Sequence, residues 1–153
     1  MVCRKLSASY VFSSHSGFLK NGILILDERN KVVDLIDTCG NIREEANLEY
    51  YNGILIPGFI NTHSRKVCIE NGSCFADDAQ SILKRMIFIQ QNNPETKLSE
   101  LLSRATIKEA KSLGIDTHAG SFEKGKLPGV NLIEKADLQL LILTGKSKIK
   151  KIV

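Results

Sequence analysis

Strand-forming segments lie at both ends of this chain, and helix-forming segments lie only between them. Short apolar runs bounded by turn residues, which are typical of β-strands, occupy residues 7–12, 22–26, 31–36 and 48–56, and again 130–134, 138–144 and 148–153. The run Ile23–Leu26 is apolar without alternation, so we expect both faces of that strand to be covered. If the two blocks of strands pair, they form one β-sandwich with helices inserted between its halves.

The middle of the chain predicts two helices. Asp77 or Asp78 can cap a helix that runs to about Gln91, and this helix is apolar on most sides, which predicts deep burial. A second helix follows over residues 97–113 and ends at Gly114. The expected fold class is therefore α+β, with a β-sandwich flanked by two inserted helices.

Composition and charge exclude several classes of protein. With 153 residues, of which 42% are hydrophobic, the chain fits one compact domain with a core. Its 21 basic and 17 acidic residues are spread along the whole length, which argues against a nucleic-acid partner. No apolar run approaches the roughly 20 residues that span a bilayer, and the start lacks a signal segment, so we expect no membrane partner and a cytoplasmic location.

The cysteines and the terminal lysines both favour structural interpretations. Four cysteines lie at positions 3, 39, 68 and 74 without metal-ligand spacing, which is typical of reduced thiols. Residues 146–151 contain four lysines interleaved with apolar residues. This pattern indicates a solvated edge strand whose charges discourage aggregation between sheets.

Two stretches resemble the ends of one known family. Residues 21–36, followed by Asn-Gly-Ile-Leu-Ile-Pro-Gly-Phe-Ile-Asn-Thr-His at 52–63, resemble the start of amidohydrolase-superfamily enzymes such as cytosine and guanine deaminases and chlorohydrolases. Residues 105–115, followed by Gly-Ser-Phe-Glu-Lys-Gly-Lys at 120–126, resemble the close of the same family. The resemblance implies a metal-dependent hydrolase ancestry and a sandwich built from both chain ends.

The resemblance also implies a division of the chain. Residues 1–60 and 118–153 would form the β-sandwich composite domain, and residues 61–117 would be a residual strand and helical segment derived from the family's barrel. A complete barrel of eight strand-helix units takes roughly 250 residues. The interval between the two family-like ends, Ser64 to Gln80, is far shorter, so we expect no complete TIM barrel and infer a large internal deletion.

The metal site implied by the resemblance is broken at its first pair of ligands. The family places His-x-His at the end of the first barrel strand, where alternate side chains point the same way and reach one metal ion. This chain has His63, Ser64 and Arg65 there. His63 is the one surviving family-type ligand position, because the permanently charged Arg65 would repel a divalent cation. No cofactor is therefore expected, and zinc or iron would be required if the family chemistry survived.

We expect the other two histidines to be surface residues. His15 lies in a serine-rich turn, and His118 lies in the polar segment after the second helix. Three functions stay open: a truncated, catalytically inactive amidohydrolase-like protein whose family chemistry would be hydrolysis of C–N bonds, a non-enzymatic module, or a residual metal-dependent hydrolase. The module would bind itself, a full-length relative or a ligand through the apolar helix residues 82–89. We expect no catalysis from the chain alone, and the sequence does not fix its role, ligand or oligomeric state.

Overall fold

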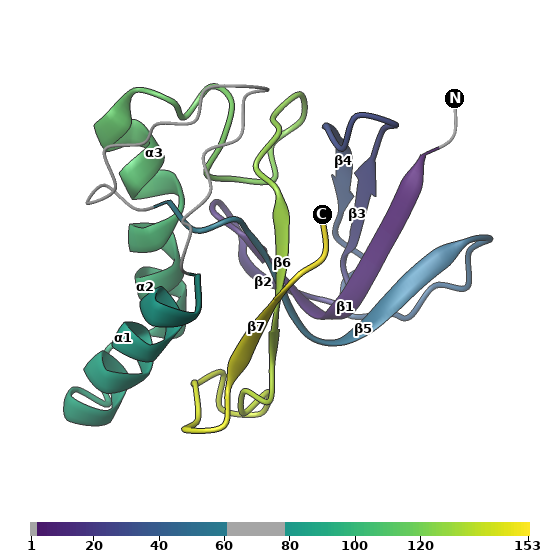
Figure 1. Cartoon of the computed structure of the whole chain (residues 1–153). Helices are drawn as coiled ribbons and strands as arrows, with labels where there is room; N and C mark the ends of the chain where they lie inside the picture. The colour runs from purple at the N-terminus through teal and green to yellow at the C-terminus, as the bar shows by residue number, and fades with distance from the viewer. Residues whose placement is uncertain (1–2, 61–78) are drawn as a thin grey trace.

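The computed structural model describes residues 3–60 and 79–153. In chain order these residues form β1 (Arg4–Ser13), β2 (Gly17–Lys20), β3 (Ile23–Leu26), β4 (Val32–Ile36), β5 (Leu48–Pro57), α1 (Ala79–Asn92), α2 (Leu98–Ala105), α3 (Ile107–Leu113), β6 (Val130–Glu134) and β7 (Lys148–Lys151). The helices lie together on one side of the strands (Figure 1). Within these ranges no helix has the length and apolar character needed to cross a lipid bilayer.

Both ends of the chain contribute to one mixed sheet. Its strand order is β4-β3-β1-β5-β6-β7, and β2 pairs with β1 beside this path. The β1–β5 pair is parallel, and the remaining pairs are antiparallel. The predicted α+β class and the sheet built from both chain ends are confirmed by the pairing of β5 with β6, in which Ile54 lies opposite Ile133.

The strands form one continuous hydrogen-bonded sheet that bends until its two halves face each other (Figure 1). The start of β1 pairs with β3, and its end pairs with β2, so this long strand belongs to both halves. Apolar side chains fill the inside of the bend. The buried members of this core are Leu6, Ala8, Val11, Leu24, Leu26, Val32, Leu55, Phe122, Val130 and Leu132.

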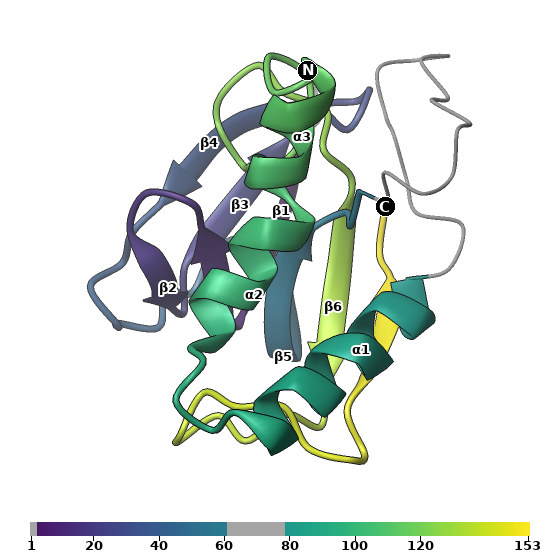
Figure 2. The same cartoon turned by 90° about the vertical axis from the view of Figure 1, so that its left-hand side faces the viewer.

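The helices cover the opposite face of the sheet (Figure 2). Phe12, Ile54 and Ile56 from the strands pack in one core with Leu83 of α1 and Leu102 of α2. The predicted deep burial of the first helix is only partly right. Its buried residues are Leu83, Met86 and Gln90, whereas Phe88 is 66% exposed.

The expected single helix over 97–113 is two helices, which meet at Thr106. The carbonyl of Ala105 accepts a hydrogen bond at 2.8 Å from the Ile60 nitrogen, which lies outside both helices. The buried Thr106 hydroxyl donates back to the Leu102 carbonyl at 2.6 Å, a contact that bends helices. Both bonds accompany the non-helical dihedral angles of Thr106, φ −124° and ψ −93°.

The strand expected over 138–144 is a tight turn. The Asp137 carboxylate accepts hydrogen bonds from the nitrogens of Gln139 and Leu140, both at 3.0 Å, and Leu141 has a φ of 52°. A side chain that bonds its own following backbone competes with strand pairing. A single bridge, Asp137 to Ile142, closes this turn.

The lysine-rich segment forms the edge strand that the sequence predicts. β7 lies at the end of the strand order, and Lys148, Lys150 and Lys151 are exposed. The side chain of Gln80 in α1 accepts a hydrogen bond from the Ile149 nitrogen at 3.2 Å. Charge and this side-chain cap together protect the edge of β7 from pairing with another sheet.

Candidate functional site

The predicted metal-ligand position lies outside the described residues. His63, Arg65, Cys68, Cys74 and both candidate capping residues, Asp77 and Asp78, belong to the range 61–78. In residues 3–60 and 79–153, no three His, Cys, Asp or Glu side chains gather where they could bind one metal ion. The part of the chain that the structure describes therefore does not fit a metal centre.

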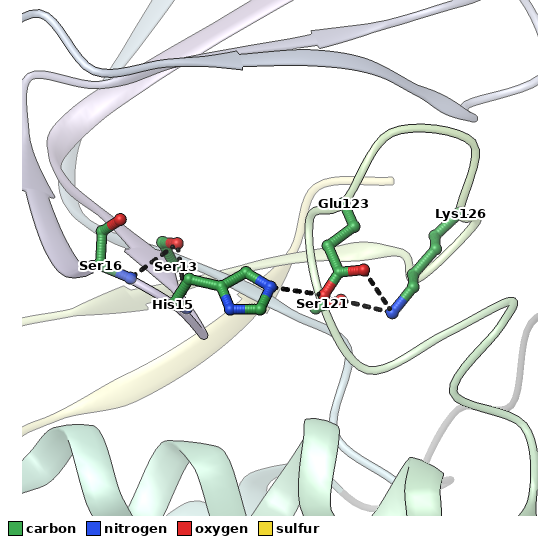
Figure 3. Close-up of polar contacts among 6 residues, drawn as sticks. All are labelled: Ser13, His15, Ser16, Ser121, Glu123 and Lys126. Atoms are coloured by element: carbon green, nitrogen blue, oxygen red, sulfur yellow. Dashed lines mark hydrogen bonds and ion pairs between the residues drawn. The ribbon is translucent and has the colours of Figure 1, made fainter.

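Four polar side chains, one from the β1–β2 turn and three from the 120–126 loop, meet beside that turn (Figure 3). We name His15, Ser121, Glu123 and Lys126 the polar cluster. His15 Nε2 lies 2.9 Å from Glu123 Oε1, and Lys126 Nζ lies 3.3 Å from Glu123 Oε2. Lys126 Nζ also donates a hydrogen bond to Ser121 Oγ at 2.8 Å. The cluster joins the N-terminal hairpin to the segment that leads into β6.

Hydrogen bonds to backbone atoms hold both sides of the polar cluster. In the turn after β1, the Ser13 hydroxyl accepts hydrogen bonds from the nitrogens of His15 and Ser16, at 3.3 and 3.2 Å. Across from it, Val32 of β4 exchanges two backbone bonds of 2.8 Å with Gly125 and Lys126. The loop that carries Glu123 is therefore attached to the sheet, and its side chains are positioned by the fold.

Burial differs sharply between the members of the polar cluster. The side chains of His15 and Glu123 are 76% and 42% exposed, whereas that of Lys126 is 9% exposed. Partial burial acts to raise the pKa of Glu123, but hydrogen bonds from Lys126 and His15 outweigh it, so the pKa lies below its ordinary value. Glu123 is therefore ionised near neutral pH and balances the charge of the buried lysine.

The polar cluster has the composition of a serine–lysine catalytic pair but not its arrangement. A lysine that activates a serine must be neutral to accept the serine proton. Lys126 instead makes an ion pair with Glu123 and donates to Ser121. Ser121 is 1% exposed, so a substrate cannot reach its hydroxyl. The geometry supports a structural role for these residues, in which they hold the 120–126 loop in place.

The surface of the described residues has several hollows. A cleft of about 370 Å³ is lined by His15, Lys111, Asp116, Glu123 and Lys126, together with Ser14, Ile107 and Thr117. A second hollow of about 290 Å³, which we name the apolar groove, lies between the α1–α2 loop and the 137–142 turn. Its lining includes Phe18, Pro94, Leu98, Leu140, Leu141 and Ile142, with Glu95, Thr96, Lys97 and Ser99.

Sequence reasoning placed both described histidines correctly at the surface but missed the contact that His15 makes. His118 is exposed, and its carbonyl accepts a hydrogen bond from the Leu127 nitrogen at 2.7 Å. The His15–Glu123 pair spans 108 residues of sequence, so no local pattern predicts it. The 120–126 turn motif was the available signal, because it fixes where Ser121, Glu123 and Lys126 lie relative to one another.

No family model matches the sequence, and no curated protein matches it. Solved structures with partial similarity to this chain include N-acetyl-D-glucosamine-6-phosphate deacetylase from Mycobacterium smegmatis (21% identity, TM-score 0.32), aminofutalosine deaminase from Helicobacter pylori (22%, 0.29) and a putative prolidase from Bifidobacterium longum (17%, 0.29). These are amidohydrolase-superfamily enzymes. The matches cover 40%, 39% and 39% of this chain, and 15%, 16% and 16% of those proteins. The chain spans only a small part of the length of these proteins.

Proposed function

We propose that the chain is a non-catalytic, amidohydrolase-like module that binds a second copy of itself through the apolar groove. The observation that carries this proposal is the exposure of two apolar side chains that line the groove. Leu140 is 69% exposed and Ile142 is 37% exposed. Large apolar side chains that border a hollow mark protein interaction surfaces more often than isolated exposed ones do.

The turn that carries Leu140 is held rigidly. Asp137 accepts hydrogen bonds from the nitrogens of Gln139 and Leu140 at 3.0 Å, and the Asp137–Ile142 bridge closes the turn. A backbone that is already ordered loses little conformational entropy when the side chain that it carries binds. Leu140 is therefore suited to act as an anchor that enters an apolar pocket on a partner.

The same surface offers both the anchor and the pocket. The apolar groove has a volume of about 290 Å³, and Phe18, Pro94 and Leu98 line it beside Leu140. Under two-fold symmetry, Leu140 of each copy can enter the groove of the other, because a two-fold interface uses the same patch on both subunits. This self-complementarity is why we propose a second copy of the chain as the partner.

The same proposal states that the chain does not catalyse hydrolysis. Ser121 is buried and Lys126 is ion-paired, so the polar cluster offers no nucleophile for hydrolysis. The family's metal chemistry would have to act through His63, whose partner position holds Arg65. We also propose, from the sequence resemblance, that residues 1–60 and 118–153 form the composite domain, and that residues 61–117 derive from the barrel.

Light scattering after size-exclusion chromatography, over a range of concentrations, tests the proposed self-association. We expect a monomer–dimer equilibrium that Leu140→Ser weakens by at least about tenfold, the effect of losing roughly 1.4 kcal/mol at a buried anchor. Phe88→Ser is the matched control, since Phe88 is 66% exposed but does not line the apolar groove. A monomer at every concentration, or equal weakening by both variants, would show that the proposal is wrong.

A further inference from the structure

We propose that Asn52 is a site of spontaneous deamidation and that the Ser9 hydroxyl promotes the reaction. In deamidation, the main-chain nitrogen of the next residue attacks the side-chain amide of asparagine, so the site needs no enzyme. Asn52 and Gly53 lie where the β1–β5 register shifts, between the pairs Ala8–Tyr51 and Tyr10–Ile54. Two residues of β5 therefore lie opposite the single residue Ser9, as in a β-bulge.

The fold itself requires glycine after Asn52. Gly53 has a φ of 152°, which residues with a side chain rarely adopt, and a Cβ there would lie 2.3 Å from the carbonyl oxygen of Ile133. The close approach of β5 to β6 thus excludes any larger residue. Glycine in turn leaves the Gly53 nitrogen unhindered, which is the condition that makes an asparagine–glycine pair reactive.

One hydroxyl contacts both reacting groups. The Gly53 nitrogen donates a hydrogen bond to Ser9 Oγ at 3.2 Å, and Ser9 Oγ donates to Asn52 Oδ1 at 3.2 Å. As the nitrogen attacks, Ser9 can accept its proton and give its own proton to the amide oxygen, which is general acid–base catalysis. Asn52 is exposed, and no hydrogen bond from the described residues holds its Nδ2.

The reaction balances without any cofactor. The Gly53 nitrogen forms a bond to Asn52 Cγ, and the bond from Cγ to Nδ2 breaks. Ser9 passes a proton to Oδ1 as it takes one from the Gly53 nitrogen. Solvent water then moves the proton from Oδ1 to Nδ2, so that the Cγ–Oδ1 double bond forms again and ammonia leaves. The cyclic imide then takes up one water and opens to aspartate or isoaspartate. Either product adds a negative charge, and isoaspartate also adds one atom to the backbone of β5.

Asn21 and Gly22 provide an internal control. Asn21 is 8% exposed, its Nδ2 donates to the Gly40 carbonyl at 2.9 Å, and its Oδ1 accepts from the Tyr50 hydroxyl at 2.9 Å. Because both ends of the amide are held, we expect Asn21 to stay unmodified in the folded chain. The third such pair, Asn71 and Gly72, lies outside the described residues.

Peptide mass spectrometry of the folded full chain, incubated in mildly alkaline buffer, tests the proposal. We expect the peptide with Asn52 to gain about 1 Da, as an amide becomes a carboxyl group, while the peptide with Asn21 does not. Ser9→Ala should slow the conversion about tenfold, less than the roughly hundredfold of a well-placed general acid or base because both contacts are long. Ser9→Thr keeps the hydroxyl and should keep the rate.

The chain unfolded in urea, in which both asparagines are free to react, supplies the reference rate. If Asn52 converts more slowly in the folded chain than in the unfolded chain, the proposal is overturned without use of any variant. If Ser9→Ala, shown to be folded by circular dichroism, converts as fast as the unsubstituted chain or faster, the hydroxyl restrains the amide and the proposal is likewise overturned.

Discussion

Arg4 and Glu49 form a two-point ion pair between β1 and β5, in which Arg4 Nε donates to Oε1 at 2.7 Å and Nη2 donates to Oε2 at 3.0 Å. The Tyr51 hydroxyl adds a third hydrogen bond to Oε2 at 2.8 Å. The bonds from Arg4 lower the pKa of Glu49 by more than partial burial raises it. The pair therefore favours the ionised carboxylate in the folded chain.

Glu49→Gln should lower the free energy of unfolding by about 0.5 to 1 kcal/mol near neutral pH, because both side chains are 38% exposed and solvent screens the pair. The pKa of Glu49 is depressed on folding, so its contribution is present above the unfolded pKa and is lost as pH falls through the folded pKa. Urea unfolding at several acidic pH values should therefore show the difference between the two chains shrinking. Glu44→Gln, which alters an exposed carboxylate, should show no such difference.

Lys126→Met should lower the free energy of unfolding by about 1 to 3 kcal/mol, because it removes the donor to the buried Ser121 hydroxyl and the cation that pairs with the partly exposed Glu123. The methionine preserves most of the volume of the lysine stem, so the loss reports the ammonium group. Lys124→Met, at an exposed position in the same loop, should stay within about 0.5 kcal/mol. Equal effects of the two variants in urea unfolding would contradict the structural role of the polar cluster.

Leu83→Ala should lower the free energy of unfolding by about 2 to 4 kcal/mol, because Leu83 is fully buried in the core shared by α1, α2 and the sheet. Phe88→Ala on the same helix removes a larger side chain that is 66% exposed, so its cost should be below about 0.5 kcal/mol. Thermal and urea unfolding of the two variants measure both values. A larger loss for Phe88→Ala would mean that α1 docks on the sheet by another face.

Elemental analysis of the purified chain should find no stoichiometric zinc or iron, because the permanently charged Arg65 follows His63 by two residues, where the family resemblance implies a second histidine ligand. Arg65→His restores two imidazoles on alternate positions and should raise the amount of zinc retained after dialysis. Arg65→Gln is the control, since it removes the charge without adding a ligand. Stoichiometric metal in the unsubstituted chain would contradict this prediction.

Local patterns predicted the strands whose apolar residues alone mark them as strands. The segment 130–134 was expected as a strand and is β6, and the segment 48–56 matches β5 to within one residue. β2 was missed, because four residues that begin with glycine carry little pattern and gain their structure from pairing with β1. The prediction of a strand over 138–144 was wrong, because the Asp137 side chain forms hydrogen bonds with the backbone nitrogens that follow it and so forms a turn.

The candidate site was less predictable than the fold, for a physical reason. The break at Thr106 depends on a bond from Ile60, and the polar cluster depends on His15 meeting Glu123. These contacts join residues that lie far apart in sequence. The local sequence around either partner therefore does not predict them. The sequence could nevertheless indicate the 120–126 loop, since its glycines and charged residues follow a recognisable turn pattern.

The pairing of β5 with β6 has a consequence for how the chain reaches its fold. Contacts between distant segments form slowly, because a long loop must close before any of them contributes stability. During synthesis, the edge of β5 that receives β6 has no partner until residues 130–134 leave the ribosome. During that interval Ile54, Leu55 and Ile56, which are buried in the folded chain, are exposed. The newly made N-terminal half is therefore prone to aggregate until β6 is made, and chaperones would bind it at this stage.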